Sequence, residues 1–174
     1  MENAKKRRLN ILAMIGESNN ALSASAIASK LGVSRQVIVG DVALLRAHGH
    51  NIVATARGYI TETPQTSNKF SRKIACCHTP GQTKDELYLL VDSGAIVVDV
   101  VIEHEVYGEL TGYLGIKTRA DVDDFVNRFE QAGAKLLSEL TGGIHLHTIS
   151  CESEEHFIET VRKLKNAGYL VSED

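Results

Sequence analysis

Hydrophobic residues in the first 60 positions recur every three to four residues in three short stretches, the spacing of amphipathic helices. The first stretch predicts a helix over residues 4–17. Ser23 and Ser34 suit the N-caps of a second and a third helix, and Gly32 suits the end of the second. A hairpin is expected over 51–60, with its turn at 56–58. The residues expected to face the core of this region are Leu9, Leu12, Ile15, Ile27, Leu31, Ile38, Val42 and Leu45.

After residue 70, stretches rich in β-branched residues alternate with helical periodicity. Strands are expected at 72–78, 95–104, 106–116, 143–151 and 169–171, and helices at 82–91, 118–133 and 153–168. This order predicts an α/β sandwich with its helices on one face of a mixed or antiparallel sheet. The whole chain is therefore expected to be α+β. The segment 62–69, in the apolar-free stretch TETPQTSNK, is the expected linker between domains at 1–61 and 70–174.

Composition excludes several classes of protein. The chain has 174 residues, 43% hydrophobic and 24% charged, as expected for a folded globular protein. Its apolar runs are shorter than the roughly 18 residues of a membrane span, and its basic N-terminus lacks a signal-peptide cleavage site. Three cysteines, two of them adjacent, do not form a disulfide framework, so the cytoplasm is the expected location.

Charge is distributed unequally along the chain. Residues 1–60 contain eight Lys or Arg and three Asp or Glu, a net charge of +5. Residues 61–174 contain eleven Lys or Arg and nineteen Asp or Glu, a net charge of −8. A basic first module and an acidic second module indicate different partners for the two.

The first module predicts DNA binding, because three helices followed by a hairpin form a winged helix-turn-helix. In such folds the exposed N-terminal end of the third helix reads bases. There Arg suits guanine, Gln suits adenine and Val suits the thymine methyl. The alternative is a protein-interaction domain with a solvated basic face. The residues expected to contact DNA are Ser34, Arg35, Gln36, Val39 and Arg57, with Lys5, Lys6, Arg7 and Arg8 as further phosphate contacts.

A histidine pair in the second module predicts a metal site. His145 and His147 are two residues apart on an expected strand, so both imidazoles project from one face while Leu146 points into the core. His78, at the end of the first strand, can add a third imidazole, and Glu86 a carboxylate. This set suits a divalent Zn, Ni, Fe or Mn ion. The plainer alternatives are a coincidental histidine pair and a surface carboxylate.

Other side chains with reactive groups have plainer interpretations. Cys76 and Cys77 point to opposite faces of a strand and are poorly placed to share an ion. We interpret them, like Cys151, as small buried residues. His156 lies on a charged helix and is interpreted as a solvated surface histidine.

Motifs in both modules resemble a known family. CHTP with a following EL, VDSGAIVVDVVIEHEVYGEL and LTGGIHLHTIS resemble the 3H domain, and LGVSRQVI resembles a winged helix. Together they resemble the niacin-responsive transcriptional repressors over nearly the whole chain. The resemblance implies a repressor of genes for nicotinate uptake and NAD synthesis, with nicotinic acid as co-repressor. It also implies a domain similar to the HPr fold and a divalent metal bound by residues matching His78, Glu86, His145 and His147.

Two positions depart from the family pattern. Glu105 stands where a proline is expected, which adds negative charge beside His104. Gly40 stands where a longer polar residue is expected, and glycine inside a helix costs roughly 1 kcal/mol relative to alanine.

The acidic module raises the question of how an anion such as nicotinate is bound. A divalent cation would reverse the local charge. His104 and Tyr107 are candidates for contacts near the ion or with the pyridine ring, and the alternative is that they pack in a turn. Operator symmetry and the resemblance predict a homodimer. Two other interpretations remain open: a repressor that responds to the metal itself, and a metalloenzyme.

Overall fold

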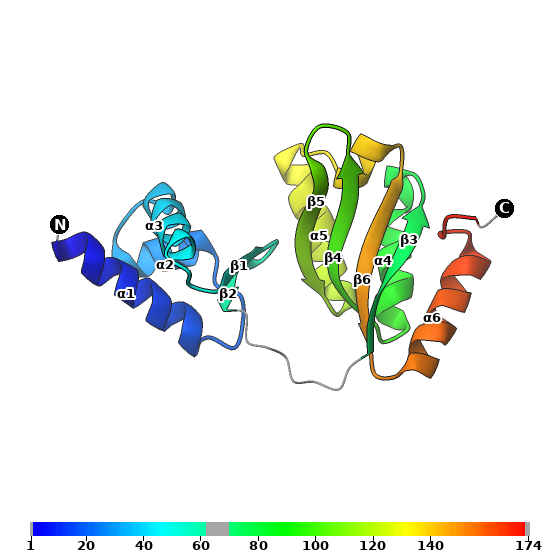
Figure 1. Ribbon diagram of the computed structural model, residues 1–174, viewed down its shortest axis with the longest axis horizontal. Helices are drawn as coiled ribbons and strands as arrows, with labels where there is room; N and C mark the ends of the chain where they lie inside the picture. The colour runs from blue at the N-terminus through cyan, green and yellow to red at the C-terminus, as the bar shows by residue number, and fades with distance from the viewer. Residues whose placement is uncertain (1, 62–69, 173–174) are drawn as a thin grey trace. The chain divides into compact units, whose positions relative to one another are not determined.

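The computed structural model describes residues 2–61 and 70–172, and the chain divides into two compact units, Met1–Thr66 and Ser67–Asp174 (Figure 1). The expected linker at 62–69 lies outside the described residues. In chain order the elements are α1 (Glu2–Glu17), α2 (Ala24–Leu31), α3 (Arg35–Ala47), β1 (Ile52–Thr55), β2 (Gly58–Thr61), β3 (Phe70–Cys77), η1 (Pro80–Gln82), α4 (Thr83–Asp92), β4 (Ile96–His104), β5 (Gly108–Ile116), α5 (Arg119–Ala132), η2 (Leu137–Thr141), β6 (Ile144–Cys151) and α6 (Glu154–Ala167).

Three helices pack around one apolar core in the N-terminal unit. Ser23 and Ser34 cap α2 and α3 as expected, and Gly32 ends α2 with a φ of 64°. The predicted buried face of α1 is wrong at Leu9, which is 60% exposed. Ile15 faces the core as expected, but Ile11 joins it in place of Leu9, because docking against α2 and α3 selects one of several apolar faces of α1. The most deeply buried apolar side chains are Ile11, Ile15, Ile27, Ile38, Val42, Leu45 and Ile52.

The hairpin of β1 and β2 follows α3 and is held against the start of α2. Tyr59 of β2 exchanges two backbone hydrogen bonds with Leu22, at 2.8 and 3.0 Å. Gly58 has a φ of 136°, and a Cβ there would overlap the carbonyl group of Leu22. Glycine is therefore required where the β1–β2 hairpin contacts the segment before α2.

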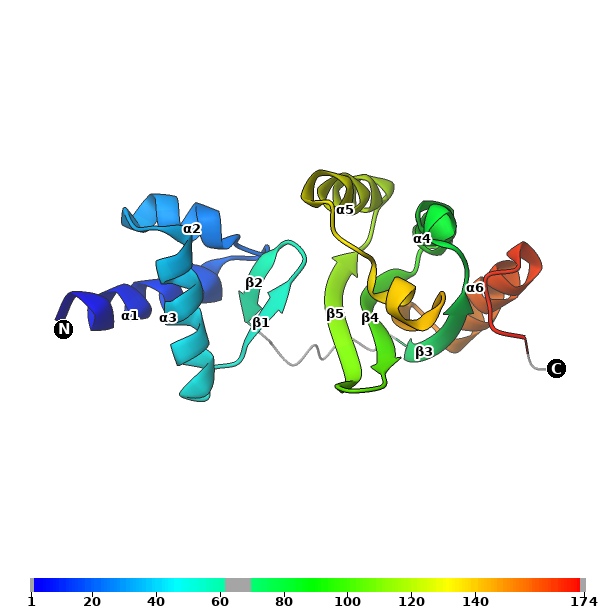
Figure 2. The ribbon, with the colours of Figure 1, turned by 90° about the horizontal axis from the view of Figure 1, so that it is seen from above.

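The C-terminal unit is a four-stranded sheet in the order β3-β6-β4-β5, with every neighbouring pair antiparallel. α4 and α5 lie over one face of this sheet (Figure 2). α6 joins them on the same core through Leu164, which packs with residues of α4, β3 and β6. This arrangement confirms the expected α+β class and decides the sheet in favour of the antiparallel alternative.

Two expectations for the last part of the C-terminal unit, residues 153–171, are wrong. Residues 169–171 form no full strand; Leu170 makes a single bridge to Cys76, while Tyr169 accepts a hydrogen bond from the N–H of Cys77 at 2.8 Å. His156 is half-buried rather than solvated. Its Nε2 donates to the carbonyl oxygen of Ser93 at the end of α4, so it joins α6 to α4.

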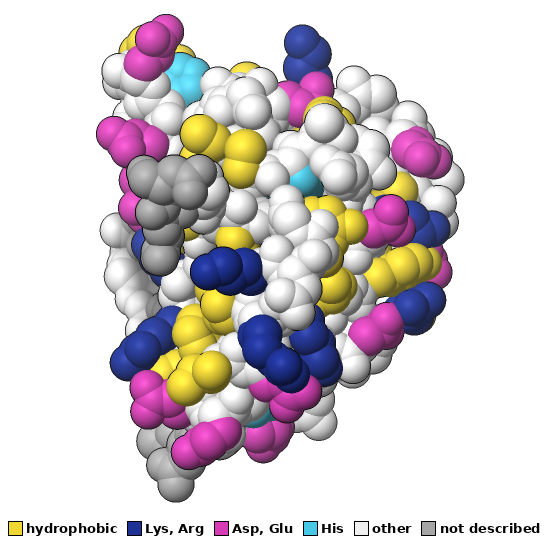
Figure 3. Space-filling model, turned by 90° about the vertical axis from the view of Figure 1, so that its right-hand side faces the viewer, with side chains coloured by type: hydrophobic (Ala, Val, Ile, Leu, Met, Phe, Trp, Pro, Cys, Tyr) yellow, Lys and Arg dark blue, Asp and Glu magenta, His cyan; other side chains and the backbone are white. Residues whose placement is uncertain are grey.

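Charges of both signs are mixed on the surface of the C-terminal unit. On the face drawn in Figure 3, Lys and Arg side chains lie among Asp and Glu side chains with small apolar areas between them. Exposed ion pairs include Arg72 with Glu154 and Lys163 with Glu159, each at 3.6 Å. The net negative charge is therefore not gathered into one acidic patch on that face. Among the described helices, none is long and apolar enough to cross a membrane.

Candidate metal centre and DNA interface

Glu86 on α4 lies at the centre of the candidate metal site. A capping box, in which the Thr79 N–H donates to Gln82 Oε1 at 3.0 Å, leads the chain from β3 through η1 into α4. Glu86 follows in the first turn of α4 and faces the sheet, with its side chain 0% exposed. The interpretation of Glu86 as a surface carboxylate is therefore wrong. A buried carboxylate has to be matched by donors or cations.

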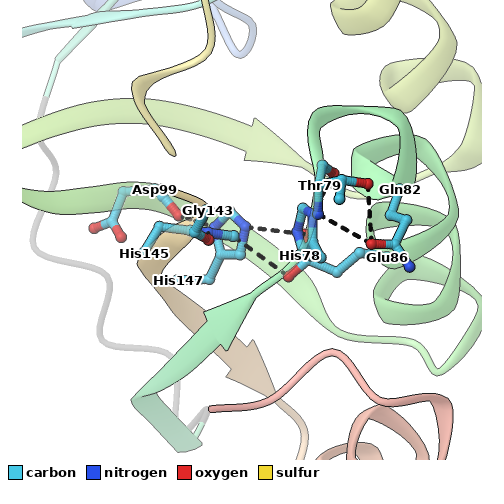
Figure 4. A network of polar contacts seen from close by, with 8 residues as sticks. All are labelled: His78, Thr79, Gln82, Glu86, Asp99, Gly143, His145 and His147. Atoms are coloured by element: carbon cyan, nitrogen blue, oxygen red, sulfur yellow. Dashed lines mark hydrogen bonds and ion pairs between the residues drawn. The ribbon is translucent and has the colours of Figure 1, made fainter. Parts of the chain in front are cut away.

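Three imidazoles face this carboxylate (Figure 4). His78 Nε2 lies 2.7 Å from Glu86 Oε2, His147 Nε2 lies 3.5 Å from Oε2, and His145 Nε2 lies 3.6 Å from Oε1. The ring of His145 is perpendicular to the rings of His78 and His147, with centroids 4.8 Å apart in each pair. β3, α4 and β6 thus bring together the four residues that the sequence singled out.

The two histidines of β6 lie on one face of a central strand, because side chains two residues apart on a strand point to the same side. His147 lies opposite Ile74 of β3 and Val100 of β4, so β6 is a central strand. His145 and His147 share one face of β6, as expected, and that face is the one turned toward Glu86 of α4. Leu146 is half-buried and points to the other face, so its expected place in the core beneath the helices is wrong. The histidines themselves occupy that side of the strand.

The other nitrogen of each ring is tied to the backbone. A carbonyl oxygen can only accept, so each Nδ1 carries the proton, and a neutral ring then directs its Nε2 lone pair at Glu86. Hydrogen bonds of this kind orient histidines that bind metals. The pairs are His78 Nδ1 with the Thr79 carbonyl (2.9 Å), His145 Nδ1 with the Gly143 carbonyl (2.8 Å) and His147 Nδ1 with the Asp99 carbonyl (2.7 Å).

The cluster therefore consists of acceptors that need a positive charge between them. With neutral rings, three Nε2 lone pairs and one carboxylate converge. Glu86 Oε1 is buried and lacks a hydrogen-bond partner among the described residues. Either protons on the rings or a cation must compensate these groups. Three imidazoles and a carboxylate fit a divalent transition-metal ion.

The pKa values in the cluster follow from the same geometry. Burial raises the pKa of Glu86, but the imidazoles outweigh this effect and hold that pKa well below its usual range. Burial lowers the pKa of His78 and His147, but the charge of Glu86 and its hydrogen bonds produce a net rise. Protons and a metal ion thus compete for the same Nε2 atoms.

Cys76 also lies at this site. Its sulfur, a carboxylate oxygen of Glu86 and a ring nitrogen of His145 are all within 4.8 Å of one another. Cys76 is fully buried as expected, but Cys77 is exposed, so that part of the interpretation is wrong. Burial and the charge of Glu86 raise the pKa of the Cys76 thiol far above its usual range. Its spacing of two residues from His78 on one strand was the signal that could have placed it here.

Gly143 is a further residue of the site that sequence reasoning did not single out. It has a φ of 98°, and a Cβ there would overlap the carbonyl oxygen of His78. Its own carbonyl holds His145. The close approach of this backbone to His78 requires glycine. The two glycines that precede the histidine pair in GGIHLH were the sequence feature that could have indicated this position.

His104 and Tyr107 lie together at the turn between β4 and β5. His104 Nδ1 accepts hydrogen bonds from the N–H groups of Val106 and Tyr107, at 3.2 and 3.3 Å. The two rings are 5.1 Å apart, and Tyr107 is 75% exposed. Across residues 70–172, no hydrogen bond, ion pair or ring contact joins either side chain to Glu86 or the three histidines. Their contacts shape the turn, as in the plainer alternative.

The first turn of α3 presents the residues expected to contact DNA. Ser34 Oγ accepts from the N–H of Val37 at 3.3 Å and caps the helix. Arg35 and Gln36 are exposed, as is Arg57 in the turn of the hairpin. Val39 is half-buried and packs against the core, which leaves only part of its side chain for a thymine methyl.

Two arginines of α1 bind inside the N-terminal unit. Arg7 Nε and Arg8 Nη1 contact the carboxylate of Asp41 at 2.5 and 3.3 Å, and Asp41, on α3, is 4% exposed. These ion pairs hold α1 against α3. Arg7 and Arg8 therefore serve this packing, while Lys5 and Lys6 are exposed.

The two units match two known domain families. An HTH domain model matches residues 7–60, and a 3H domain model matches residues 71–173. The chain is thus of the class in which an N-terminal DNA-binding HTH domain precedes a 3H domain. It is 41% identical over 174 residues to the probable transcription repressor NiaR of Thermotoga maritima, covering 99% of this chain and 98% of that protein.

A second relative supports the same assignment. The transcription repressor NadR of Bacillus subtilis is 40% identical over 169 residues, covering 96% of this chain and 94% of that protein. The chain belongs to the family of NiaR and NadR transcription repressors. The resemblance drawn from its motifs is confirmed.

Proposed function

We propose that this chain represses genes for nicotinate uptake and NAD synthesis in the cytoplasm, with nicotinic acid as its co-repressor. Membership of the repressor family supports the regulatory role. The observation that carries the proposal is the direction of three Nε2 atoms at the buried Glu86 carboxylate. This donor set suits a cation, and a cation is what an acidic module needs to bind a small anion.

His78, Glu86, His145 and His147 would hold the divalent Zn, Ni, Fe or Mn ion. When bound, the ion supplies positive charge that attracts the carboxylate or ring nitrogen of nicotinate. The chain orients the imidazoles through their Nδ1–H bonds to backbone carbonyls. His104 and Tyr107 are proposed as contacts of the pyridine ring at the β4–β5 turn.

Operator recognition is assigned to α3 and the hairpin. Arg35 and Gln36 would read base edges, with a partial contribution from Val39, while Ser34 and Arg57 would contact phosphates or the minor groove. A homodimer would space two recognition helices one turn of DNA apart, roughly 34 Å. Binding of nicotinic acid would favour that spacing, and by linkage the operator would raise nicotinic acid affinity by the same factor.

Fluorescence anisotropy of DNA binding tests this function. The DNA duplex is first selected from random sequences by the metal-loaded protein in the presence of nicotinic acid. The full chain is measured with and without metal, and with nicotinic acid, nicotinamide or neither. Metal and nicotinic acid together should raise DNA affinity by about tenfold or more. Operator affinity of metal-loaded protein that is indifferent to nicotinic acid would exclude the co-repressor role.

The same assay tests the DNA interface. Arg35→Ala should weaken specific binding by about tenfold or more, because it removes an expected guanine contact. Arg162→Ala removes the same charge from α6 in the C-terminal unit and should leave DNA binding within about twofold. Equal effects of the two substitutions would contradict the assignment of α3.

A second candidate, a repressor that responds to the metal itself, is favoured by the burial of the site. The side chains of Glu86 and the three histidines are only 0–4% exposed, which leaves little open surface for another molecule. In this case metal alone would produce the full rise in DNA affinity in the anisotropy experiment. Nicotinic acid would then add nothing.

A further inference from the structure

Cys76 is placed as a ligand would be, although sequence reasoning gave it no role. It lies opposite His145 in the β3–β6 pair and on the same side of β3 as Ile74. Its sulfur lies within 4.8 Å of both a Glu86 oxygen and a His145 ring nitrogen. The side chain is 0% exposed. An ion held between His145 and Glu86 is therefore within reach of the sulfur after small side-chain movements.

An unpartnered atom at the same place indicates where such an ion belongs. Glu86 Oε1 is fully buried and lacks a hydrogen-bond partner among the described residues. It is also the oxygen nearest to His145, at 3.6 Å. His78 and His147 instead approach Oε2. The Oε1 side of the carboxylate thus has one imidazole and the thiol as its neighbouring donors.

We propose that Cys76 is a further ligand of the ion held by His78, Glu86, His145 and His147. The inference rests on the metal site of the proposed function. On binding, the S–H bond breaks, a sulfur–metal bond forms and the proton is released to solvent, with no change of oxidation state. A thiolate selects Zn²⁺ or Co²⁺ over Mn²⁺, because Mn²⁺ prefers oxygen ligands. The chain would thereby be tuned to a thiophilic ion.

Absorption spectroscopy of the full chain loaded with Co²⁺ tests the assignment. Visible ligand-field bands report Co²⁺ in the site whatever its ligands, whereas a near-ultraviolet charge-transfer band reports a Co²⁺–thiolate bond. We expect both bands in the wild type, and Cys76→Ser should lose the charge-transfer band. Cys77→Ser is the matched control, since it removes the adjacent exposed thiol, and it should keep both bands.

The remaining outcomes separate the two proposals. Ligand-field bands without a charge-transfer band in the wild type would overturn the role of Cys76 and leave the metal site standing. A charge-transfer band retained in Cys76→Ser would do the same. Absence of Co²⁺ uptake by the wild type would overturn the metal site and this inference with it.

Metal selectivity provides an independent readout. Cys76→Ser should weaken Zn²⁺ binding by about tenfold while changing Mn²⁺ binding by less than about twofold. If Cys76→Ser does not fold, cadmium NMR of the wild type alone still tests whether Cys76 binds the ion. The ¹¹³Cd resonance of cadmium-loaded wild type should be shifted far downfield by a sulfur ligand, and a resonance in the nitrogen and oxygen range would overturn the proposal.

Discussion

At the scale of single residues, Glu86 organises the candidate centre because one buried carboxylate receives three rings. The Nδ1 of each ring is hydrogen-bonded to a backbone carbonyl, which orients its Nε2 toward Glu86. Arrangements of this kind hold metal ligands in place before the ion arrives. The cost of burying so many acceptors together is what a cation would relieve.

Replacing the carboxylate by an amide should abolish metal binding. Glu86→Gln keeps the size of the side chain but removes the charge that the ion would neutralise. After dialysis, mass spectrometry should find about one ion per chain in the wild type and only traces in the variant. Asp85→Asn removes the charge of the exposed neighbour on α4 and should retain the ion. Wild-type metal content in Glu86→Gln would contradict the site.

The pKa shifts predict an unusual dependence of stability on pH in chelator-treated protein. The pKa values of His78 and His147 are raised above 6.5, so their stabilising contribution is complete below pH 6.5 and lost as the pH rises through the raised values. The pKa of Glu86 is lowered below 4.5, so its contribution is complete above pH 4.5 and lost as the pH falls through the lowered value.

Thermal unfolding followed by circular dichroism checks this dependence. The contribution of the cluster should be greatest between pH 4.5 and 6.5 and should decline toward alkaline pH. With Zn²⁺ bound, the alkaline decline should disappear, since the cation replaces the protons. Identical profiles with and without Zn²⁺ would count against the cluster as the metal site.

At the scale of elements, Gly40 lowers the stability of helix α3, whereas the β1–β2 hairpin requires glycine at position 58. Nothing lies within 4 Å of the place where a Cβ on Gly40 would stand, so Gly40→Ala should raise the free energy of unfolding by about 1 kcal/mol. Gly58→Ala is the matched substitution, and it should destabilise the N-terminal unit through its positive φ and its overlap with Leu22. Urea unfolding measures both, and loss of stability in Gly40→Ala would contradict the account of α3.

The element boundaries were largely predictable because they depend on local chemistry. Ser23 and Ser34 cap their helices through hydrogen bonds within three residues, and Gly32 ends a helix through its own backbone freedom. The buried face of α1 was not predictable in the same way. Several of its faces are apolar, and only docking decides that Leu9 is exposed while Ile11 is buried.

The residues that gather at the candidate site were predictable from the sequence, but their burial was not. Alternation along a strand correctly placed His145 and His147 on one face. The burial of Glu86 depends on how α4 lies on the sheet, which local sequence does not specify. The nearness of Cys76 depends on the register between β3 and β6, and the tie between α6 and α4 through His156 depends on the same kind of long-range packing.

At the scale of the whole molecule, the charge asymmetry corresponds to the division into two units. The basic N-terminal part matches an HTH domain, and the acidic remainder matches a 3H domain. Two of the basic residues, Arg7 and Arg8, form ion pairs with Asp41 inside the first unit. In the proposed function the cation at Glu86 reconciles an acidic sensor with an anionic effector.

Calorimetric titration of nicotinic acid into the full chain tests this central claim most directly. Metal-loaded wild type should bind about one nicotinic acid per chain, whereas chelator-treated wild type and dialysed Glu86→Gln should bind none, because the cation is what attracts the anion. Asp85→Asn, loaded in the same way, should bind as the wild type does. Equal binding of nicotinic acid with and without metal, or no binding to metal-loaded protein, would contradict the account.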